Sequence, residues 1–238
     1  MKPYIINAEE LESLENIPAV VIGNGPSRLQ YDIAALKGRC IVFGCNRFFE
    51  DAETFKGFPF MFGACDDTVY RAVDRRKEIL EYFPLLVPEN AHPLSERLSR
   101  IINFKERKWL NTGHAMIQFA FDLKCSPVFI VGFGDQPLKI VEGAYLENVY
   151  KHDSFEKGQR ISPTPSYSNN VNRFVNTLKI LKTKNPRSLF RIGDHSGALR
   201  FIEVVEYKEL IDALPFKYSQ KVTRIDEARA TIKIQTIN

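Results

Sequence analysis

The chain has few cysteines, no long apolar run and no strong excess of charge. Its four cysteines are Cys40, Cys45, Cys65 and Cys125, and no two of them form a C-x-x-C pair. No stretch approaches the roughly 20 apolar residues of a membrane-spanning helix, and residues 1–16 contain no apolar segment typical of a signal peptide. We therefore expect free thiols in a reducing compartment and a cytoplasmic protein without an integral membrane segment.

The charge balance points to no polyanionic partner. The formal net charge is +4 and charges of both signs are interspersed, so we expect no nucleic acid as a partner. One basic cluster consists of Lys179, Lys182, Lys184, Arg187 and Arg191. We interpret it as the solvated end of a helix, with a patch for an anionic membrane or acceptor as the alternative.

The order of apolar patterns predicts an α/β fold. Short β-like runs alternate with segments of helical period, which is typical of a mostly parallel sheet flanked by helices, as in Rossmann-like folds. The clearest helices follow Asn111-Thr112-Gly113 and Ser168-Asn169, the second corresponding to residues 170–183. The expected strands cover residues 19–22, 40–44, 60–64, 85–87, 127–131 and 188–192.

No repeat or linker divides the rest of the chain. Because 44% of its residues are hydrophobic, residues 1–238 can form one domain with a substantial core. We expect a helix from Leu199 through Leu214, then an alternating strand from Thr231 to Ile237 that lies at the sheet edge or pairs with a partner chain. The irregular segment 136–168 is long for a connection, which favours a lid over a merely flexible loop.

Two predicted strands end in glycine and asparagine, where open α/β sheets bind their ligands. Gly23 and Gly25 permit close approaches that a Cβ would block, and Pro26 suits the first turn of a helix. Asn24 adds an amide that can donate and accept. Alone, this turn could be a tight connection without a ligand. The second run, which ends in Cys45-Asn46, favours a nucleotide site.

Several motifs occur in a definite order between Ala19 and Glu203. They are Ile22-Gly23-Asn24-Gly25-Pro26-Ser27, Cys45-Asn46-Arg47-Phe48, Asn111-Thr112-Gly113, Ile130-Val131-Gly132, and Ser196 with Phe201-Ile202-Glu203. This combination resembles the bacterial sialyltransferases of the Campylobacter type, glycosyltransferase family 42. The resemblance implies a single-domain, GT-A-like Rossmann core with a flexible lid. It also implies CMP-sialic acid as donor, no metal, and inversion of the anomeric carbon.

The resemblance assigns roles to the strand ends. Asn24 and Asn46 would contact the phosphate and ribose of the nucleotide, and Thr112 with Gly113 would hold the CMP portion. From its place at the end of a strand, Asp135 could bind a ribose hydroxyl or orient a lid residue. The predicted nucleotide-binding residues are Gly23, Asn24, Gly25, Pro26, Ser27, Asn46, Asn111, Thr112, Gly113, Gly132 and Asp135.

Sialyl transfer needs a base for the acceptor hydroxyl and groups that stabilise the leaving phosphate. In the family the base is a histidine just before the helix that corresponds to residues 170–183. Here that place reads Ser166-Tyr167-Ser168-Asn169-Asn170, without a histidine. Tyr145, Tyr150 and Tyr167 could donate hydrogen bonds to the leaving phosphate, and Tyr145 and Tyr150 are the predicted phosphate-binding residues.

We predict His152 and Tyr167 as the catalytic residues. His152 lies in the predicted lid beside Asp153, which could orient it, and the alternative is an exposed loop histidine. His114 and His195 are further candidates for the base. His114 lies in the first turn of a predicted helix, and His195 lies after a strand at the ligand-bearing edge.

The resulting hypothesis is a glycosyltransferase-like enzyme that moves a sugar from a CMP-activated donor to a glycan acceptor. It needs no cofactor besides the donor, and self-association into a homo-oligomer is plausible from the family. An alternative is a pyrophosphokinase related to the MptE-like proteins, which would use Mg²⁺ and a nucleoside triphosphate and could recruit Asp66 and Asp135. The pair Asp66-Asp67 also fits a helix cap. A third hypothesis is a nucleotide-binding protein without catalysis.

Overall fold

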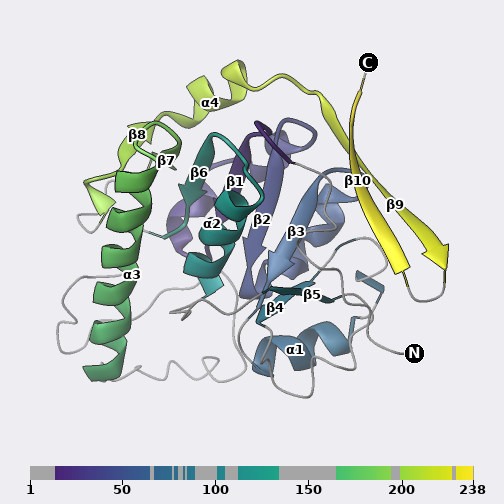
Figure 1. Cartoon of the computed structure of the whole chain (residues 1–238), viewed down its shortest axis with the longest axis horizontal. Coiled ribbons are helices and arrows are strands. Elements are labelled where there is room, and N and C mark those ends of the chain that lie inside the picture. The colour runs from purple at the N-terminus through teal and green to yellow at the C-terminus, as the bar shows by residue number, and fades with distance from the viewer. Residues whose placement is uncertain are drawn as a thin grey trace.

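The computed structural model describes residues 14–64, 67–76, 78–79, 83, 85–88, 101–104, 112–133, 165–193, 199–226 and 229–237. Within them, eight strands form one sheet in the order β5-β4-β3-β2-β1-β6-β7-β8. Every neighbouring pair in this sheet runs parallel (Figure 1). The predicted α/β class is therefore confirmed. The strands are β1 (Ala19–Ile22), β2 (Ile41–Cys45), β3 (Phe60–Gly63), β4 (Leu85–Pro88), β5 (Ile101–Phe104), β6 (Val128–Val131), β7 (Leu189–Ile192) and β8 (Glu203–Val205).

Helical segments cover both faces of the sheet. Alternate residues of a strand point to opposite faces, and in β1 Ala19 and Val21 join one hydrophobic cluster while Val20 and Ile22 join the other. The α-helices are α1 (Asp67–Asp74), α2 (Thr112–Asp122), α3 (Pro165–Lys184) and α4 (Tyr207–Ala213). The 3₁₀ helices are η2 (Pro26–Gln30), η3 (Ile33–Leu36) and η4 (Asn46–Phe55).

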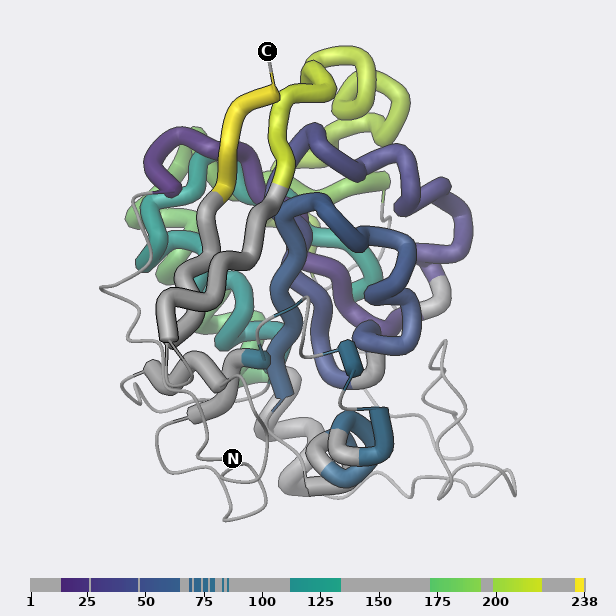
Figure 2. The backbone as a smooth tube through the Cα atoms, turned by 90° about the vertical axis from the view of Figure 1, so that its right-hand side faces the viewer, coloured from purple at the N-terminus to yellow at the C-terminus, as the bar shows by residue number. Residues whose placement is uncertain are grey.

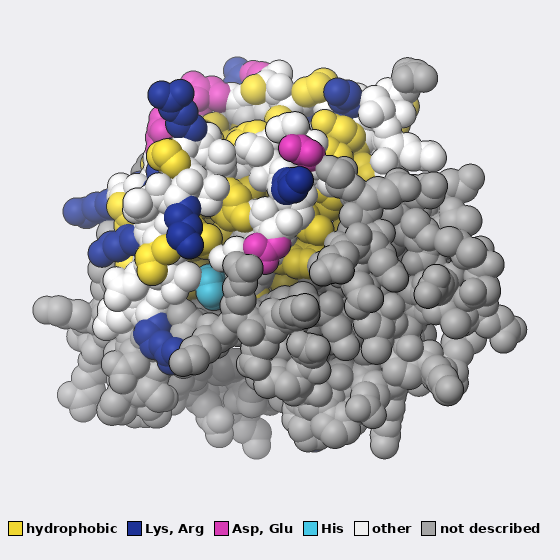
Figure 3. Space-filling view, viewed as in Figure 1, with side chains coloured by type: hydrophobic (Ala, Val, Ile, Leu, Met, Phe, Trp, Pro, Cys, Tyr) yellow, Lys and Arg dark blue, Asp and Glu magenta, His cyan; other side chains and the backbone are white. Residues whose placement is uncertain are grey.

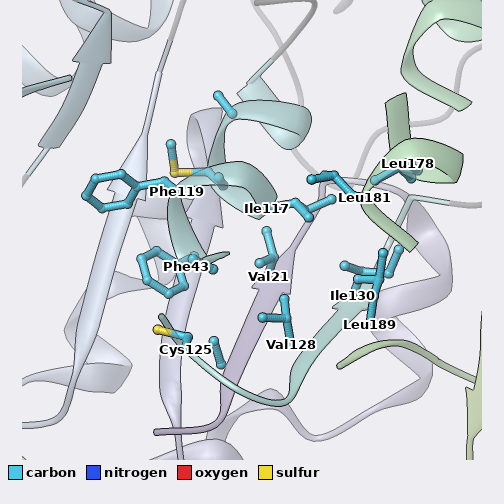
Figure 4. Packing of buried hydrophobic residues seen from close by; sticks show 14 of the residues in the cluster. Val21, Phe43, Ile117, Phe119, Cys125, Val128, Ile130, Leu178, Leu181 and Leu189 are labelled. Carbon is cyan, nitrogen blue, oxygen red and sulfur yellow. The ribbon is translucent and has the colours of Figure 1, made fainter. Parts of the chain in front are cut away.

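The face on which Ala19 and Val21 lie, here the helical face, packs against α2 and α3 (Figure 4). α3 spans 20 residues and begins with Pro165, a residue that suits the first position because its missing N–H would have no partner there. Its inner side is buried in this cluster through Phe174, Leu178 and Leu181. No described helix combines the length with the apolar character needed to cross a membrane.

The face on which Val20 and Ile22 lie, here the ring face, packs against η3, η4, α1 and α4. Its cluster holds seven buried phenylalanines, Phe48, Phe49, Phe55, Phe60, Phe62, Phe83 and Phe129. The Phe60 ring is central to it. Phe60 stacks on Phe55 with centroids 5.2 Å apart and meets Phe83 edge-on at 4.9 Å.

In the main sheet the strand pattern was largely predictable, and only β5 and β8 were not predicted. The six predicted strands match β1, β2, β3, β4, β6 and β7 within one residue at each end. The predicted helix from Leu199 through Leu214 is wrong in its first half, because residues 203–205 pair with β7 as the edge strand β8. The predicted lid also ends earlier, because residues 165–168 already belong to α3. Its remainder, 136–164, lies outside the described residues.

The C-terminal strand pairs with β9 and does not lie at the edge of the main sheet, which corrects that part of the prediction. β10 (Arg229–Thr236) forms an antiparallel hairpin with β9 (Tyr218–Asp226) (Figure 2). The hairpin is anchored at its start, where the backbone N–H groups of Lys217 and Tyr218 donate to Gly38 O at 2.6 and 2.7 Å. Ile234 packs against the core of the helical face.

Candidate functional site

The candidate site lies at the switch point of the sheet. From β1 the chain proceeds outward through β2, β3, β4 and β5 on one side, and it then returns to place β6 on the other side of β1. Connections after β1 and β6 therefore leave in different directions at the carboxyl ends of these strands. Open α/β sheets bind their ligands at this position.

The ends of β1 and β6 touch through glycine backbones. Gly23 N–H donates to Val131 O at 2.8 Å and Gly25 N–H to Gly132 O at 3.0 Å. A Cβ on Gly23 would lie 2.3 Å from Gly132 O, so the predicted close approach is present at Gly23. Gly132 has φ +73°, which a side chain would disfavour. Gly25 has φ −67°, a value open to any residue.

Asn24 presents a buried acceptor at this junction. Its Oδ1 is buried and has no hydrogen-bond partner among the described residues. A buried acceptor left without a donor costs roughly 1–3 kcal/mol. A hydroxyl or amino group of a ligand would remove that cost.

Asn46 and Thr112 come together although they are far apart in sequence. Thr112 Oγ1 donates to Asn46 Oδ1 at 2.7 Å, and Thr112 is only 5% exposed. Asn46 follows β2 with φ 51°, a left-handed conformation that asparagine tolerates better than most residues. Because its oxygen accepts from Thr112, the Asn46 amide turns its Nδ2 donors elsewhere. The two side chains therefore meet at one edge of the sheet, as predicted.

Phe133 also belongs to this junction, and the motifs did not reveal it. A Cβ on Gly113 would lie 2.3 Å from the Phe133 ring, and a Cβ on Gly23 would lie 3.1 Å from it. On its other side the ring is 5.9 Å from that of Phe174 in α3. The available signal was its place directly after Gly132 at a strand end.

Of the three histidines considered as a base, His114 lies within the described residues. It lies in the first turn of α2 and is 7% exposed. Burial lowers its pKa from the ordinary value of 6.5. The imidazole is therefore mostly neutral at neutral pH, so one of its ring nitrogens can accept a hydrogen bond or a proton.

The remaining predicted residues are described in part or not at all. Pro26 opens η2 and Ser27 follows it, Tyr167 lies in the first turn of α3, and α1 begins at Asp67, which fits the capping interpretation. The predicted residues outside the described part of the chain are Asp66, Asn111, Asp135, Tyr145, Tyr150, His152 and His195.

The basic cluster near the end of α3 divides into two residues with structural hydrogen bonds and three exposed residues. Lys182 Nζ donates to the carbonyls of Pro186 and Leu189 at 2.6 and 2.8 Å, and buried Arg191 donates through Nε to Ile202 O at 2.9 Å. Lys179, Lys184 and Arg187 are exposed. Figure 3 shows Lys and Arg side chains on the side of the molecule where α3 lies. The solvated helix end is the better description of these three.

Three of the four cysteines are described, and they lie in the core. Cys40, Cys45 and Cys125 are buried, and burial raises the pKa of the Cys125 thiol to about 12. Burial likewise raises the pKa of Cys40 far above its ordinary range. These thiols stay protonated and pack as small apolar groups.

No known protein family matches the sequence, and no curated protein matches it either. Solved structures resemble the chain in fold. The monofunctional α-2,3-sialyltransferase Cst-I from Campylobacter jejuni matches with a TM-score of 0.50 and 14% identity, over 82% of each chain. A variant of the sialyltransferase Cst-II in complex with CMP matches with a TM-score of 0.52 and 12% identity, over 93% of this chain and 91% of that chain. The chain therefore has the fold of these sialyltransferases, as its motifs implied.

Proposed function

We propose that the chain is a glycosyltransferase that transfers a sugar from a CMP-activated donor to a glycan acceptor. The observation that carries the proposal is the 2.7 Å hydrogen bond from Thr112 to Asn46, which orients an amide at the switch point. The fold supports it, because Cst-II shares this fold and was crystallised in complex with CMP.

The two asparagines offer complementary groups to a nucleotide. Asn46 has its oxygen engaged by Thr112, so its Nδ2 donates to an oxygen of the ligand. Asn24 has a buried oxygen with no donor among the described residues, so it accepts from a hydroxyl. A ribose phosphate supplies both, with phosphate oxygens as acceptors and ribose hydroxyls as donors.

The proposed transfer is a direct displacement. The acceptor hydroxyl oxygen forms a bond to the anomeric carbon, the bond from that carbon to the phosphate oxygen breaks, and CMP leaves with the electron pair. A base takes the hydroxyl proton, and hydrogen-bond donors stabilise the phosphate. We assign His152 and Tyr167 to catalysis and Tyr145 and Tyr150 to the phosphate. α3 connects the parallel strands β6 and β7, so its first turn, with Tyr167, lies at the carboxyl edge.

Calorimetry with CMP tests the proposal. We expect CMP to bind in the presence of EDTA, and we expect Asn24→Ala and Asn46→Ala each to weaken it strongly because each removes one ligand contact. Binding of only a nucleoside triphosphate with Mg²⁺ would instead favour the pyrophosphokinase hypothesis and would overturn this one.

Thr112→Val tests the orienting hydrogen bond. The valine keeps the shape of the side chain but cannot donate to Asn46, so the amide loses its fixed orientation. We expect CMP affinity to fall by about two- to twelvefold, equivalent to the roughly 0.5–1.5 kcal/mol of one net hydrogen bond. Thr112→Ser keeps the hydroxyl and is the matched control. Equal losses in both variants, measured by calorimetry, would remove the hydrogen bond from the proposal.

Hydrolysis of CMP-sialic acid separates an active enzyme from a protein that only binds nucleotide. We expect slow release of CMP by the wild-type chain and reduced release by His152→Ala and by Tyr167→Phe. Binding of CMP without any hydrolysis or transfer would favour the hypothesis without catalysis. Unchanged rates in both variants would remove these residues as catalytic.

A further inference from the structure

Arg28 is a buried charge directly behind the Gly23–Ser27 turn. It is the only charged residue between Glu15 and Asp32, and it is 3% exposed. Its Nη2 lies 2.8 Å from Oδ2 of Asp51 in η4. The interaction joins η2, which follows Asn24, to the segment that begins with Asn46.

The guanidinium of Arg28 lies over the aromatic ring of Phe48. The guanidinium carbon lies 4.7 Å from the centroid of the Phe48 ring, a distance typical of a cation–π interaction. The ring is itself fully buried and lies over Gly44, where a Cβ would come within 2.3 Å of it. Arg28 therefore contacts the Asn46 segment through both Phe48 and Asp51.

Stability alone is a poor reason for this arrangement. Taking the guanidinium of Arg28 out of water carries a desolvation penalty, and apolar replacements of buried charges are often neutral or stabilising. The guanidinium instead provides a directional, charge-assisted hydrogen bond to Asp51 that fixes geometry. Such fixing matters here because η2 and η4 are 3₁₀ helices whose N-caps, Gly25 and Cys45, make no side-chain capping hydrogen bond.

We propose that Arg28 and Asp51 form a clamp that sets the separation and orientation of Asn24 and Asn46. Arg28 is then a positioning residue that acts through the two amides and does not touch the nucleotide. The clamp rests on the proposed function in that its effect on ligand affinity assumes CMP as the ligand.

A different role for Arg28 predicts the opposite sign in one variant. A buried cation near the site could simply attract the phosphate. Asp51→Asn would then strengthen CMP binding, because it leaves the positive charge of Arg28 uncompensated. For a clamp, Asp51→Asn weakens binding, because the amide no longer holds the guanidinium by a charge-assisted hydrogen bond.

Calorimetry with CMP and with cytidine, which has no phosphate, distinguishes the two roles. We expect Arg28→Met and Asp51→Asn to weaken both ligands alike by about tenfold, the lower end of what losing an outer-shell partner costs at metal sites. Arg28→Lys should restore little, because lysine lacks the planar guanidinium that lies over the Phe48 ring. Arg76→Met is the matched control, since Arg76 pairs with Glu78 at 3.5 Å in an exposed position, and it should leave affinity unchanged. Tighter CMP binding by Asp51→Asn with unchanged cytidine binding would overturn the clamp, as would unchanged affinity in both variants.

A measurement without ligand keeps the clamp separate from the proposed function. In ¹⁵N-correlated NMR spectra, Arg28→Met and Asp51→Asn should each shift the side-chain amide signals of both Asn24 and Asn46, whereas Arg76→Met should not. Absence of CMP binding by the wild-type chain would sink the proposed function while these spectra still test the clamp. Should Arg28→Met fail to fold, Asp51→Asn decides alone, since the Asp51 side chain is 37% exposed. Unmoved signals in that variant would overturn the clamp.

Discussion

The helical face and the ring face cover the same sheet by different means. The helical face uses two α-helices of 11 and 20 residues with three buried phenylalanines in its cluster, Phe43, Phe119 and Phe174. The ring face has seven and is covered in part by 3₁₀ segments. In a 3₁₀ helix the hydrogen-bond geometry is poorer than in an α-helix, and on this face large rings fill the space against the sheet. A region without long helices thus depends more on individual side-chain contacts.

The candidate site lies where these two regions meet. Asn24 and Asn46 lie beside the 3₁₀ segments η2 and η4, whereas Thr112 begins α2 on the helical face. The hydrogen bond between Asn46 and Thr112 therefore connects η4 on the ring face with α2 on the helical face. The helix places Thr112 through its own backbone, while the asparagines rely on nearby side chains to hold their segments.

The largest expected effect is on the ring face. Phe60→Ala removes a fully buried ring that lies near the rings of Phe48, Phe55, Phe62 and Phe83. We expect the free energy of unfolding, measured in urea, to fall by about 3–5 kcal/mol. Leu29→Ala, at a residue 67% exposed, should change it by less than about 0.5 kcal/mol.

Phe43→Leu and Phe60→Leu compare the two faces directly. Phe43 has a ring partner in Phe119 at 6.1 Å, whereas Phe60 has several. Aromatic pairs contribute roughly 0.5–1.5 kcal/mol beyond buried area, so Phe60→Leu should cost more. Equal costs would show that ring contacts do not distinguish the faces.

A smaller effect is expected at the junction of β1 and β6. Gly23→Ala forces a methyl group against Gly132 O, a backbone atom 2.3 Å away, and we expect it to cost about 1–3 kcal/mol of stability and to abolish detectable CMP binding. In Gly113→Ala the methyl group meets the Phe133 ring, which can move, so the loss should be smaller. A tolerated Gly23→Ala in thermal melts and calorimetry would contradict the close approach.

The smallest expected effect is the pH dependence of stability that His114 contributes on the helical face. Because burial lowers its folded-state pKa below 6.5, the unfolded chain binds the proton more readily, and stability decreases as pH falls through this value. We expect urea unfolding to show a decline between about pH 7 and about pH 5 that is shallower in His114→Phe. Identical pH slopes in the two proteins would show that His114 does not contribute.

The fold was predictable where its cause is local. β1 is a short apolar run that ends at glycine, and its fully buried residues are those of a central parallel strand. β8 was missed because Glu203–Val205 is a strand only through its pairing with β7. The C-terminal hairpin was missed in part because β9 gave no clear alternating signal of its own. Pairing partners depend on the whole fold.

The sequence by itself determined that Asn24 and Asn46 lie at one sheet edge, because both follow neighbouring parallel strands. Only the tertiary structure decided which groups hold them. Thr112 reaches Asn46 across 66 residues, and Arg28 reaches Asp51 across 23. Such contacts arise when helices and turns pack on the finished sheet, and neither residue spacing nor composition encodes that packing.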